Sequence, residues 1–153
     1  MTGKTVELVI NWPQAKIGGM EFKEHETRGL FILEKDGNYH SKDMLFYSAR
    51  DTEKGTGRDL LSEYLASNEV KEAFLNAIKK AGLKANKEIN VFLPEKPIHY
   101  KGKYLRNGDR WWYWLKPRGS KSSTLFEISL LYGVVSCNYA SANGGVAPVF
   151  SVA

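Results

Sequence analysis

The chain has 153 residues, of which 42% are hydrophobic and 25% charged, and this fits one globular domain with its own core. Its 22 basic and 17 acidic residues give a net charge of +5 without a basic tail, and its single cysteine excludes an internal disulfide and a multi-cysteine zinc site. There is no signal-peptide stretch and no apolar run of the roughly 18 residues that span a bilayer, so we expect a cytoplasmic or virion protein without membrane insertion.

Alternating apolar residues predict strands in the first part of the chain. Residues 6–10 alternate with a period of two, and Pro13 ends this strand because proline has no N–H to donate to a ladder. Residues 29–33 form a second predicted strand, and Asp36-Gly37 is typical of a hairpin turn. Residues 41–56 show no clear period. The chain is therefore expected to begin in a sheet.

Two helices are predicted in the middle of the chain. The first has an apolar stripe made of Leu60, Leu61, Tyr64 and Leu65. Ser67 or Asn68 begins the second helix, and Gly82 ends it. The apolar face of this second helix consists of Val70, Phe74, Leu75 and Ile78.

Strands and turns are predicted for the remainder. Residues 89–93 form a short strand, and residues 100–109 form a polar, basic loop. From Trp111 onward only strands and turns are expected, among them an alternating strand over residues 125–131. The order of N-terminal strands, two central helices and a C-terminal irregular β-rich region indicates the α+β class.

Isolated reactive residues give no sign of catalytic chemistry. Cys137 has no helix N-terminus or base beside it to activate it, so we interpret it as an inert thiol that is buried or half-buried. His25, His40 and His99 are scattered along the chain, and we interpret them as exposed loop residues.

The C-terminal segment has a recognisable order of residues. Trp112-Tyr-Trp-Leu-Lys-Pro117 is followed by a Ser-rich stretch, Gly133-Val-Val, Ala140 and Gly145-Val-Ala-Pro-Val-Phe150. This resembles the "WWLRSP … G-x-V … A … GVRPAF" ending of phage and bacterial proteins with a C-type-lectin-like fold. Several of those are variable proteins of diversity-generating retroelements, in which adenine-directed mutagenesis rewrites a C-terminal binding surface. The resemblance implies a single C-type-lectin-like domain over residues 1–153, with 111–153 as the variable, ligand-binding region.

The same resemblance implies two interleaved sets of residues in this region. The scaffold set is Trp114, Leu115, Pro117, Val135, Ala140, Gly145, Val146, Pro148 and Phe150. The displayed, ligand-binding set is Tyr113, Arg118, Lys121, Glu127, Ser129, Leu131, Tyr132, Ser136, Asn138, Tyr139, Ser141 and Asn143. The anchors would be tyrosines, because tyrosine buries a large area at little cost in rotamer freedom. We expect Trp114, Val146 and Phe150 to be buried, and Tyr113, Asn138 and Tyr139 to be exposed on one contiguous face.

The function implied is non-enzymatic recognition of a protein or other surface ligand, such as a receptor, by a hypervariable surface. No cofactor is expected, nor lectin-type calcium, because the segment lacks the clustered carboxylates that hold a hard cation. A homo-oligomer is compatible with this function.

Two alternatives belong to other classes. In residues 101–121 basic residues are interspersed with aromatic ones, and this mixture could bind single-stranded nucleic acid. However, consecutive aromatic residues on an extended chain point alternately to the two faces, so about half of them should belong to the core. An enzyme on the related formylglycine-generating fold would need a copper-binding pair of cysteines, which Cys137 alone cannot supply.

Overall fold

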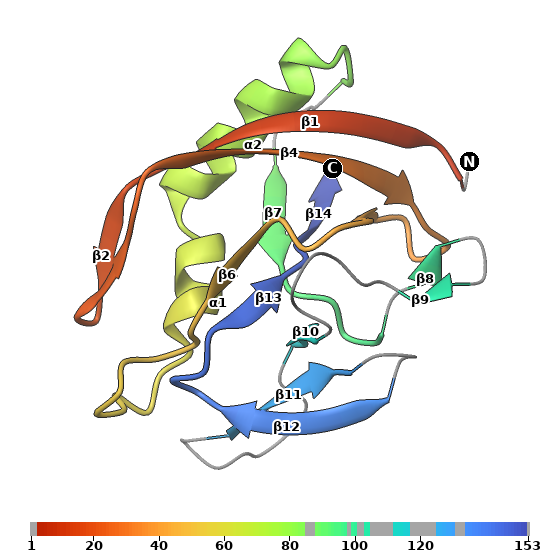
Figure 1. Ribbon diagram of the computed structural model, residues 1–153. Helices are drawn as coiled ribbons and strands as arrows, with labels where there is room; N and C mark the ends of the chain where they lie inside the picture. Colours follow the sequence, from red (N-terminus) through yellow and green to blue (C-terminus); the bar gives the residue numbers. More distant parts are fainter. Residues whose placement is uncertain are drawn as a thin grey trace.

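The computed structural model describes residues 3–84, 88–97, 99–100, 103–104, 112–116, 125–130 and 134–152. Two long, curved strands, β1 (Thr5–Trp12) and β4 (His25–Leu33), arch over one end of the molecule (Figure 1). At the opposite end lie β11 (Leu125–Ser129) and β12 (Val135–Tyr139). β1 and β4 belong to one five-stranded sheet, and β11 and β12 belong to another.

The first sheet, sheet A, has the strand order β1-β4-β5-β14-β7 with antiparallel neighbours throughout. Its other strands are β5 (Tyr39–Ser41), β7 (Ile89–Phe92) and β14 (Val149–Val152). The strands predicted at residues 6–10 and 29–33 are confirmed as parts of β1 and β4, and the strand predicted at 89–93 is confirmed as β7, which ends at Phe92. The alternation of β1 buries Leu8, Ile10 and Trp12.

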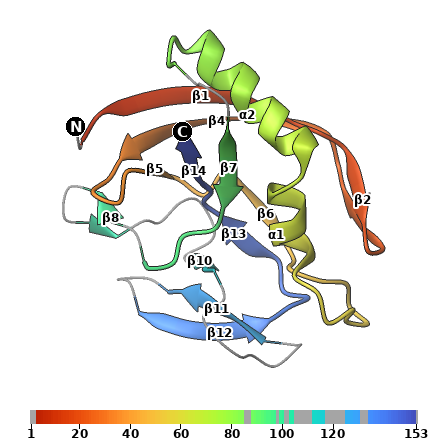
Figure 2. The ribbon, with the colours of Figure 1, turned by 180° about the vertical axis from the view of Figure 1, so that it is seen from behind.

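Both predicted helices are confirmed, as α1 (Leu60–Leu65) and α2 (Asn68–Lys80). The hydroxyl oxygen of Ser67 accepts a hydrogen bond from the N–H of Val70 and so caps α2. Gly82, at φ 82°, ends the helix in the left-handed conformation that glycine adopts without strain. The buried face of α2 packs against β1 and β7, and α1 lies beside β7 (Figure 2).

The second sheet, sheet C, has the strand order β12-β11-β10-β13-β6. It combines β10 (Tyr113–Trp114), β13 (Gly144–Val146) and β6 (Phe46–Ser48) with the β11–β12 hairpin. The contact between β10 and β13 is parallel, and the other pairs are antiparallel. Two small hairpins, β2 (Ala15–Ile17) with β3 (Met20–Phe22) and β8 (His99–Tyr100) with β9 (Lys103–Tyr104), complete the described elements.

The prediction of an α+β, C-type-lectin-like fold with two central helices is wrong. The protein is mostly β, with 43% strand against 16% helix, and its described residues form two helices and a curled sheet. Much of the additional sheet comes from β2, β3, β5 and β6, which have three residues each. Three residues place at most two side chains on one face, so the sequence of such a strand has no alternation to detect. The strand predicted over 125–131 ends at Ser129, and Leu131 lies outside the described residues.

Candidate functional site

The cross-strand register of sheet C assigns its side chains to two faces, because directly opposed residues share a face. Phe126 lies opposite Asn138, Ile128 opposite Ser136, and Trp114 opposite Ile128, and this inner face points to the core. The outer face contains the alternate residues Tyr113, Leu125, Glu127, Ser129, Val135, Cys137 and Tyr139.

One half of the outer face is covered. Tyr113 and Ser129 are each only 1% exposed. Tyr113 belongs to a small second core, which it forms with Met44, Leu115 and Ala147. The segment before β6 thus covers the β10 side of the outer face, and no ligand can reach Tyr113 there.

The other half is open along β12, whereas Leu125 and Glu127 on β11 are half-buried. Tyr139 is 66% exposed and Val135 40% exposed, and Cys137 between them is exposed as well. We call the five residues Leu125, Glu127, Val135, Cys137 and Tyr139 the open face. Val134, just before β12, is 57% exposed. The open face therefore presents aliphatic, aromatic and thiol groups next to one carboxylate.

The open face contains only part of the predicted ligand-binding set. Tyr139 and Glu127 belong to it, and Ser141 and Asn143 are exposed in the turn that follows β12. Ser136 and Asn138 lie on the inner face and are half-buried, so the expectation that Asn138 shares a face with Tyr139 is wrong. The expectation that Tyr113 is exposed is also wrong, and Ser129 is buried with it. Arg118, Lys121, Leu131 and Tyr132 lie outside the described residues.

The predicted burial of Trp114, Val146 and Phe150 is confirmed, since each is 0% exposed. Val135 and Cys137 depart from their interpretations as a scaffold residue and a buried or half-buried thiol, because both are exposed on β12. The sequence did contain one indication of this surface, namely a valine, a cysteine and a tyrosine at every second position of residues 135–139. The prediction instead included Ser136 and Asn138, which lie between these residues and therefore point to the other face of the sheet.

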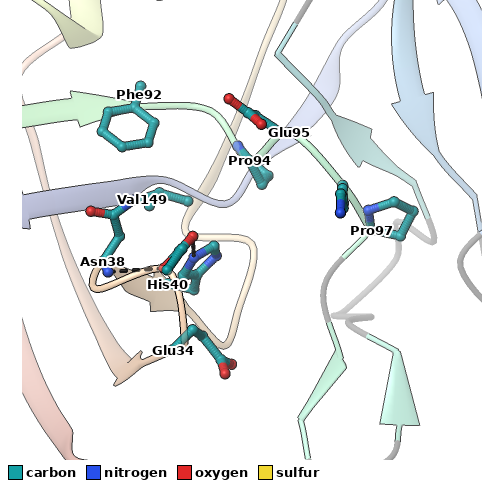
Figure 3. A pocket seen from close by; sticks show the side chains of 10 residues that line it. Glu34, Asn38, His40, Phe92, Pro94, Glu95, Pro97 and Val149 are labelled. Carbon is teal, nitrogen blue, oxygen red and sulfur yellow. Dashed lines mark hydrogen bonds and ion pairs between the residues drawn. The ribbon is translucent and has the colours of Figure 1, made fainter. Parts of the chain in front are cut away.

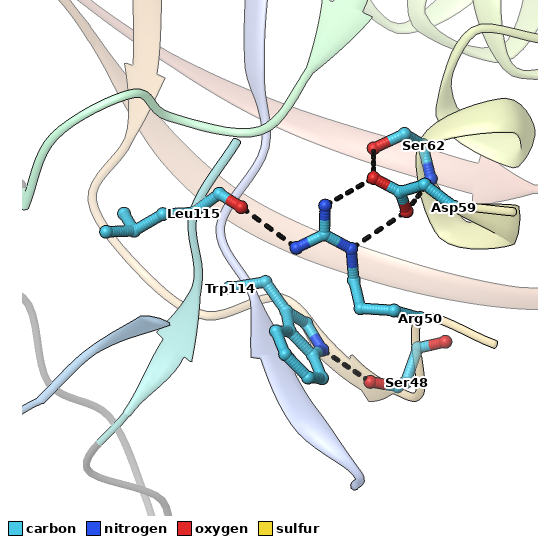
Figure 4. A network of polar contacts seen from close by, with 6 residues as sticks. All are labelled: Ser48, Arg50, Asp59, Ser62, Trp114 and Leu115. Carbon is cyan, nitrogen blue, oxygen red and sulfur yellow. Dashed lines mark hydrogen bonds and ion pairs between the residues drawn. The ribbon is translucent and has the colours of Figure 1, made fainter. Parts of the chain in front are cut away.

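A buried arginine joins the inner face to the start of α1 (Figure 4). The guanidinium of Arg50, which is 0% exposed, donates Nε–H to Asp59 Oδ1 at 2.8 Å, pairs with the other carboxylate oxygen of Asp59, and donates to the carbonyl oxygen of Leu115 at 2.9 Å. It lies 4.4 Å from the ring centroid of Phe126 and 5.2 Å from that of Trp114. These contacts hold the inner face of sheet C, which lies directly beneath the open face, in place. Sequence reasoning missed Arg50 because its segment has no period.

A separate cavity of about 390 Å³ lies beside the end of sheet A (Figure 3). Its lining is Glu34, Asp36, Asn38, His40, Phe92, Pro94, Glu95, Lys96, Pro97 and Val149. His40 Nε2 lies 2.8 Å from Asp36 Oδ2. Burial raises the pKa of Asp36, but hydrogen bonds from the Asn38 backbone N–H and from His40 outweigh it, so the pKa of this carboxyl lies below its usual value.

The Asp36–His40 pair can hold or transfer a proton. The ten lining residues include no hydroxyl or thiol group for it to activate. His25 and His40 both lie in strands and are half-buried, so their interpretation as exposed loop residues is wrong. Sequence reasoning missed this cavity because its residues come from three segments that are distant in the chain, 34–40, 92–97 and 149.

Further features bear on the remaining expectations. Within the described residues no three His, Cys, Asp or Glu side chains gather as metal ligands, and neither helix is long and apolar enough to cross a membrane. In the basic aromatic stretch 101–121, Trp112, Tyr113 and Trp114 are all buried, so these three rings cannot stack on bases. The side chains of the other aromatic residues in this stretch lie outside the described part of the chain.

Comparison of the chain with protein-family models, curated proteins and solved structures gives no match.

Proposed function

We propose that this protein is a non-enzymatic binding protein that recognises a protein or other surface ligand through the open face of sheet C. The observation that carries the proposal is the exposure of Tyr139, with 66% of its surface accessible on a regular strand. A tyrosine on a strand loses little conformational freedom on binding, because its backbone is already ordered and its side chain has two rotatable angles.

The surroundings of Tyr139 support this proposal. Leu125 lies directly opposite it on β11, and Val135 lies four residues away on the same face of β12. The turn that follows β12 adds the exposed polar residues Ser141 and Asn143. Protein interfaces typically combine an aromatic and aliphatic centre with a polar rim, and this surface has both parts.

The stability of the open face comes from residues on the inner side of the same sheet. Phe126 and Ile128 are buried there, and Arg50 contacts the Phe126 ring. A binding surface can change its side chains without loss of fold when the core beneath it is independent of those side chains. Substitutions of Val135, Cys137 and Tyr139 should therefore be tolerated.

The proposal includes sequence variability of this surface, as the C-terminal resemblance implies. The DNA beside the gene provides the test. A nearby reverse-transcriptase gene and a near-copy of the 3′ coding end, differing at adenines, would support variability. Absence of both would contradict variability and would leave the binding proposal to be decided by the following experiment.

The binding proposal is tested with a photo-crosslinking amino acid at position 139. Tyr47 provides the matched control position, because it is a tyrosine with 38% exposure on β6, the opposite edge strand of sheet C. We expect the probe at 139, but not the probe at 47, to form a covalent adduct in extracts of the source organism. Unlabelled wild-type protein should compete with this adduct, and Tyr139→Ala protein should not.

Two results would contradict the proposal. Equal adducts from positions 47 and 139 would show that the open face has no preference over another exposed tyrosine. An adduct that is removed by nuclease and lost steeply with rising salt would instead favour the nucleic-acid alternative, because phosphate contacts release counterions.

A further inference from the structure

The free edge of β12 differs from the edges that proteins ordinarily protect. β12 is the last strand in the order of sheet C, so one side of its backbone faces no described strand. Natural edge strands are usually guarded by lysine, proline, inward charges or a bulge. Residues 134–139, Val-Val-Ser-Cys-Asn-Tyr, contain no charge and no proline, and their one-to-one register with β11 contains no bulge. Such an edge is suited to pairing with another strand.

The hydrogen-bond pattern shows which residues present this edge. The N–H of Leu130 donates to the carbonyl oxygen of Val134 at 2.7 Å, so that pair is hydrogen-bonded. Hydrogen-bonded and non-hydrogen-bonded pairs alternate in an antiparallel ladder, which leaves Val135, Cys137 and Tyr139 with backbone groups directed away from β11. The carbonyl oxygen of Glu127, opposite Cys137, agrees with this, because it accepts from Leu115 on the other side of β11.

We propose that β12 pairs antiparallel with β12 of a second copy of this chain, about a two-fold axis at Cys137. Cys137 then lies opposite Cys137 of the second copy, and Val135 lies opposite Tyr139 of the second copy. The two C sheets become one continuous sheet. This inference concerns the backbone edge of β12 and goes beyond the proposed function, which concerns side chains of the open face.

Charge and side-chain pairing favour a second copy as the occupant. Each chain has a net charge of +5, so two copies repel each other least along an uncharged strip, and residues 134–139 provide one. The two-fold axis produces two aromatic–β-branched pairs of Tyr139 with Val135, a favourable kind of cross-strand pair. Two existing contacts of Tyr139 bear on the pairing. The side-chain oxygen of Asn138 accepts from the N–H of Tyr139 at 2.7 Å and must release it. The carbonyl oxygen of Tyr139 accepts from the N–H of Ala142 at 3.0 Å and must accept a second hydrogen bond, for which a carbonyl has a second lone pair.

The pairing should be a concentration-dependent equilibrium. One short edge buries less than the roughly 1,200 Å² of a standard stable interface. Sedimentation velocity of the full chain should therefore show a monomer at low concentration and a dimer at high concentration.

Cys137 provides a direct test, because it is the only cysteine in the chain. Opposed residues in a hydrogen-bonded antiparallel pair have Cα atoms about 5.5 Å apart, so a short bis-maleimide can bridge the two thiols without any redox step. The control is Ser141→Cys in a Cys137→Ser background, which places an exposed thiol just outside β12. We expect cross-linking through Cys137 to be at least about tenfold faster than through the control, because paired strands hold thiols at millimolar effective concentration.

Further variants test the edge and its register. Cys137→Lys brings two ammonium groups together and should abolish the dimer in sedimentation, whereas Ser141→Lys should not. In the Cys137→Ser background, Val135→Cys should cross-link with Tyr139→Cys in a mixture but not with itself. Self-linking of Val135→Cys would overturn the antiparallel register. A monomer at every concentration, with Cys137 no faster than the control, would overturn the proposal, as would a monomer whose edge binds an unrelated strand.

Failure of this inference is distinguishable from failure of the proposed function. Photo-crosslinking at position 139 gives an adduct of twice the chain mass for self-pairing and an adduct of another mass for a ligand. Loss of the first adduct alone removes the dimer, and loss of the second alone removes the binding function.

Discussion

Arg50 and Asp59 form a bidentate ion pair beneath sheet C, and the Arg50 side chain is fully buried. Asp59 also caps α1, since its carboxylate accepts from the N–H of Ser62 at 3.1 Å. The pair therefore links the start of the helical segment to the sheet that carries the open face.

Replacement of the arginine is expected to destabilise the whole fold. Arg50→Ala removes the hydrogen bonds to Asp59 and Leu115 and leaves the Asp59 carboxylate without its cation. Breaking a buried pair at one partner lowers the free energy of unfolding by about 3–5 kcal/mol. Urea unfolding followed by circular dichroism measures this. Arg28→Ala, which breaks an exposed pair with Glu7, is the control and should cost less than about 1 kcal/mol.

Two tyrosines of the same sheet should respond oppositely to truncation. Tyr113→Ala empties a buried site and should lower the free energy of unfolding by about 3–5 kcal/mol, as for other large core aromatics. Tyr139→Ala should change it by less than about 0.5 kcal/mol, because the side chain is largely exposed. Thermal unfolding of both variants, each compared with the wild type, measures these two changes in stability. A comparable loss in the two would show that the outer face is not divided into a covered and an open half.

The glycine at the start of β13 is required for close packing. A Cβ atom at Gly144 would lie 2.5 Å from the Trp112 ring and 2.6 Å from Trp114 Nε1. Because both rings are buried, Gly144→Ala should destabilise the protein by about 1–3 kcal/mol through overpacking. Ser141→Ala, in the exposed turn just before it, should have little effect in the same denaturant titration. Equal stability of the two variants would be inconsistent with this packing.

Asp51 should make stability depend on acid pH. Burial raises the pKa of its carboxyl, but hydrogen bonds from the Thr56 N–H and hydroxyl and from the N–H groups of Thr52 and Gly57 bring the pKa below the ordinary 3.8. A lowered folded-state pKa gives stability that is present above the unfolded pKa and is lost as the pH falls through the folded one.

Asp51→Asn should therefore cost about 1–3 kcal/mol at neutral pH, the range for lost charge-assisted hydrogen bonds. The difference from wild type should be smaller at pH 3 than at pH 7 in urea unfolding. Glu53→Gln removes an exposed carboxylate from the same loop and provides the control. A difference that grows on acidification would refute the assignment.

The elements that could be predicted from sequence are those with several turns or alternations. An N-terminal cap and an apolar face predict the helix over residues 68–80, and apolar residues at every second position predict the strand over residues 6–10. The three-residue strands could not be predicted, because they depend on partners distant in the chain. At the candidate site the burial of the scaffold residues Trp114, Val146 and Phe150 was predictable. The face on which Asn138 lies was not, since it depends on register, and neither was the cover over Tyr113, since it comes from the segment around Met44.

The position of β14 has a consequence for when this protein can function. This last strand lies between β5 and β7 in sheet A, and β13 joins β10 to β6 in sheet C. While a ribosome still holds residues 144–152, neither sheet is complete. The open face and the edge of β12 therefore acquire their final geometry only after residues 144–152 have emerged from the ribosome, so recognition by this surface requires their synthesis.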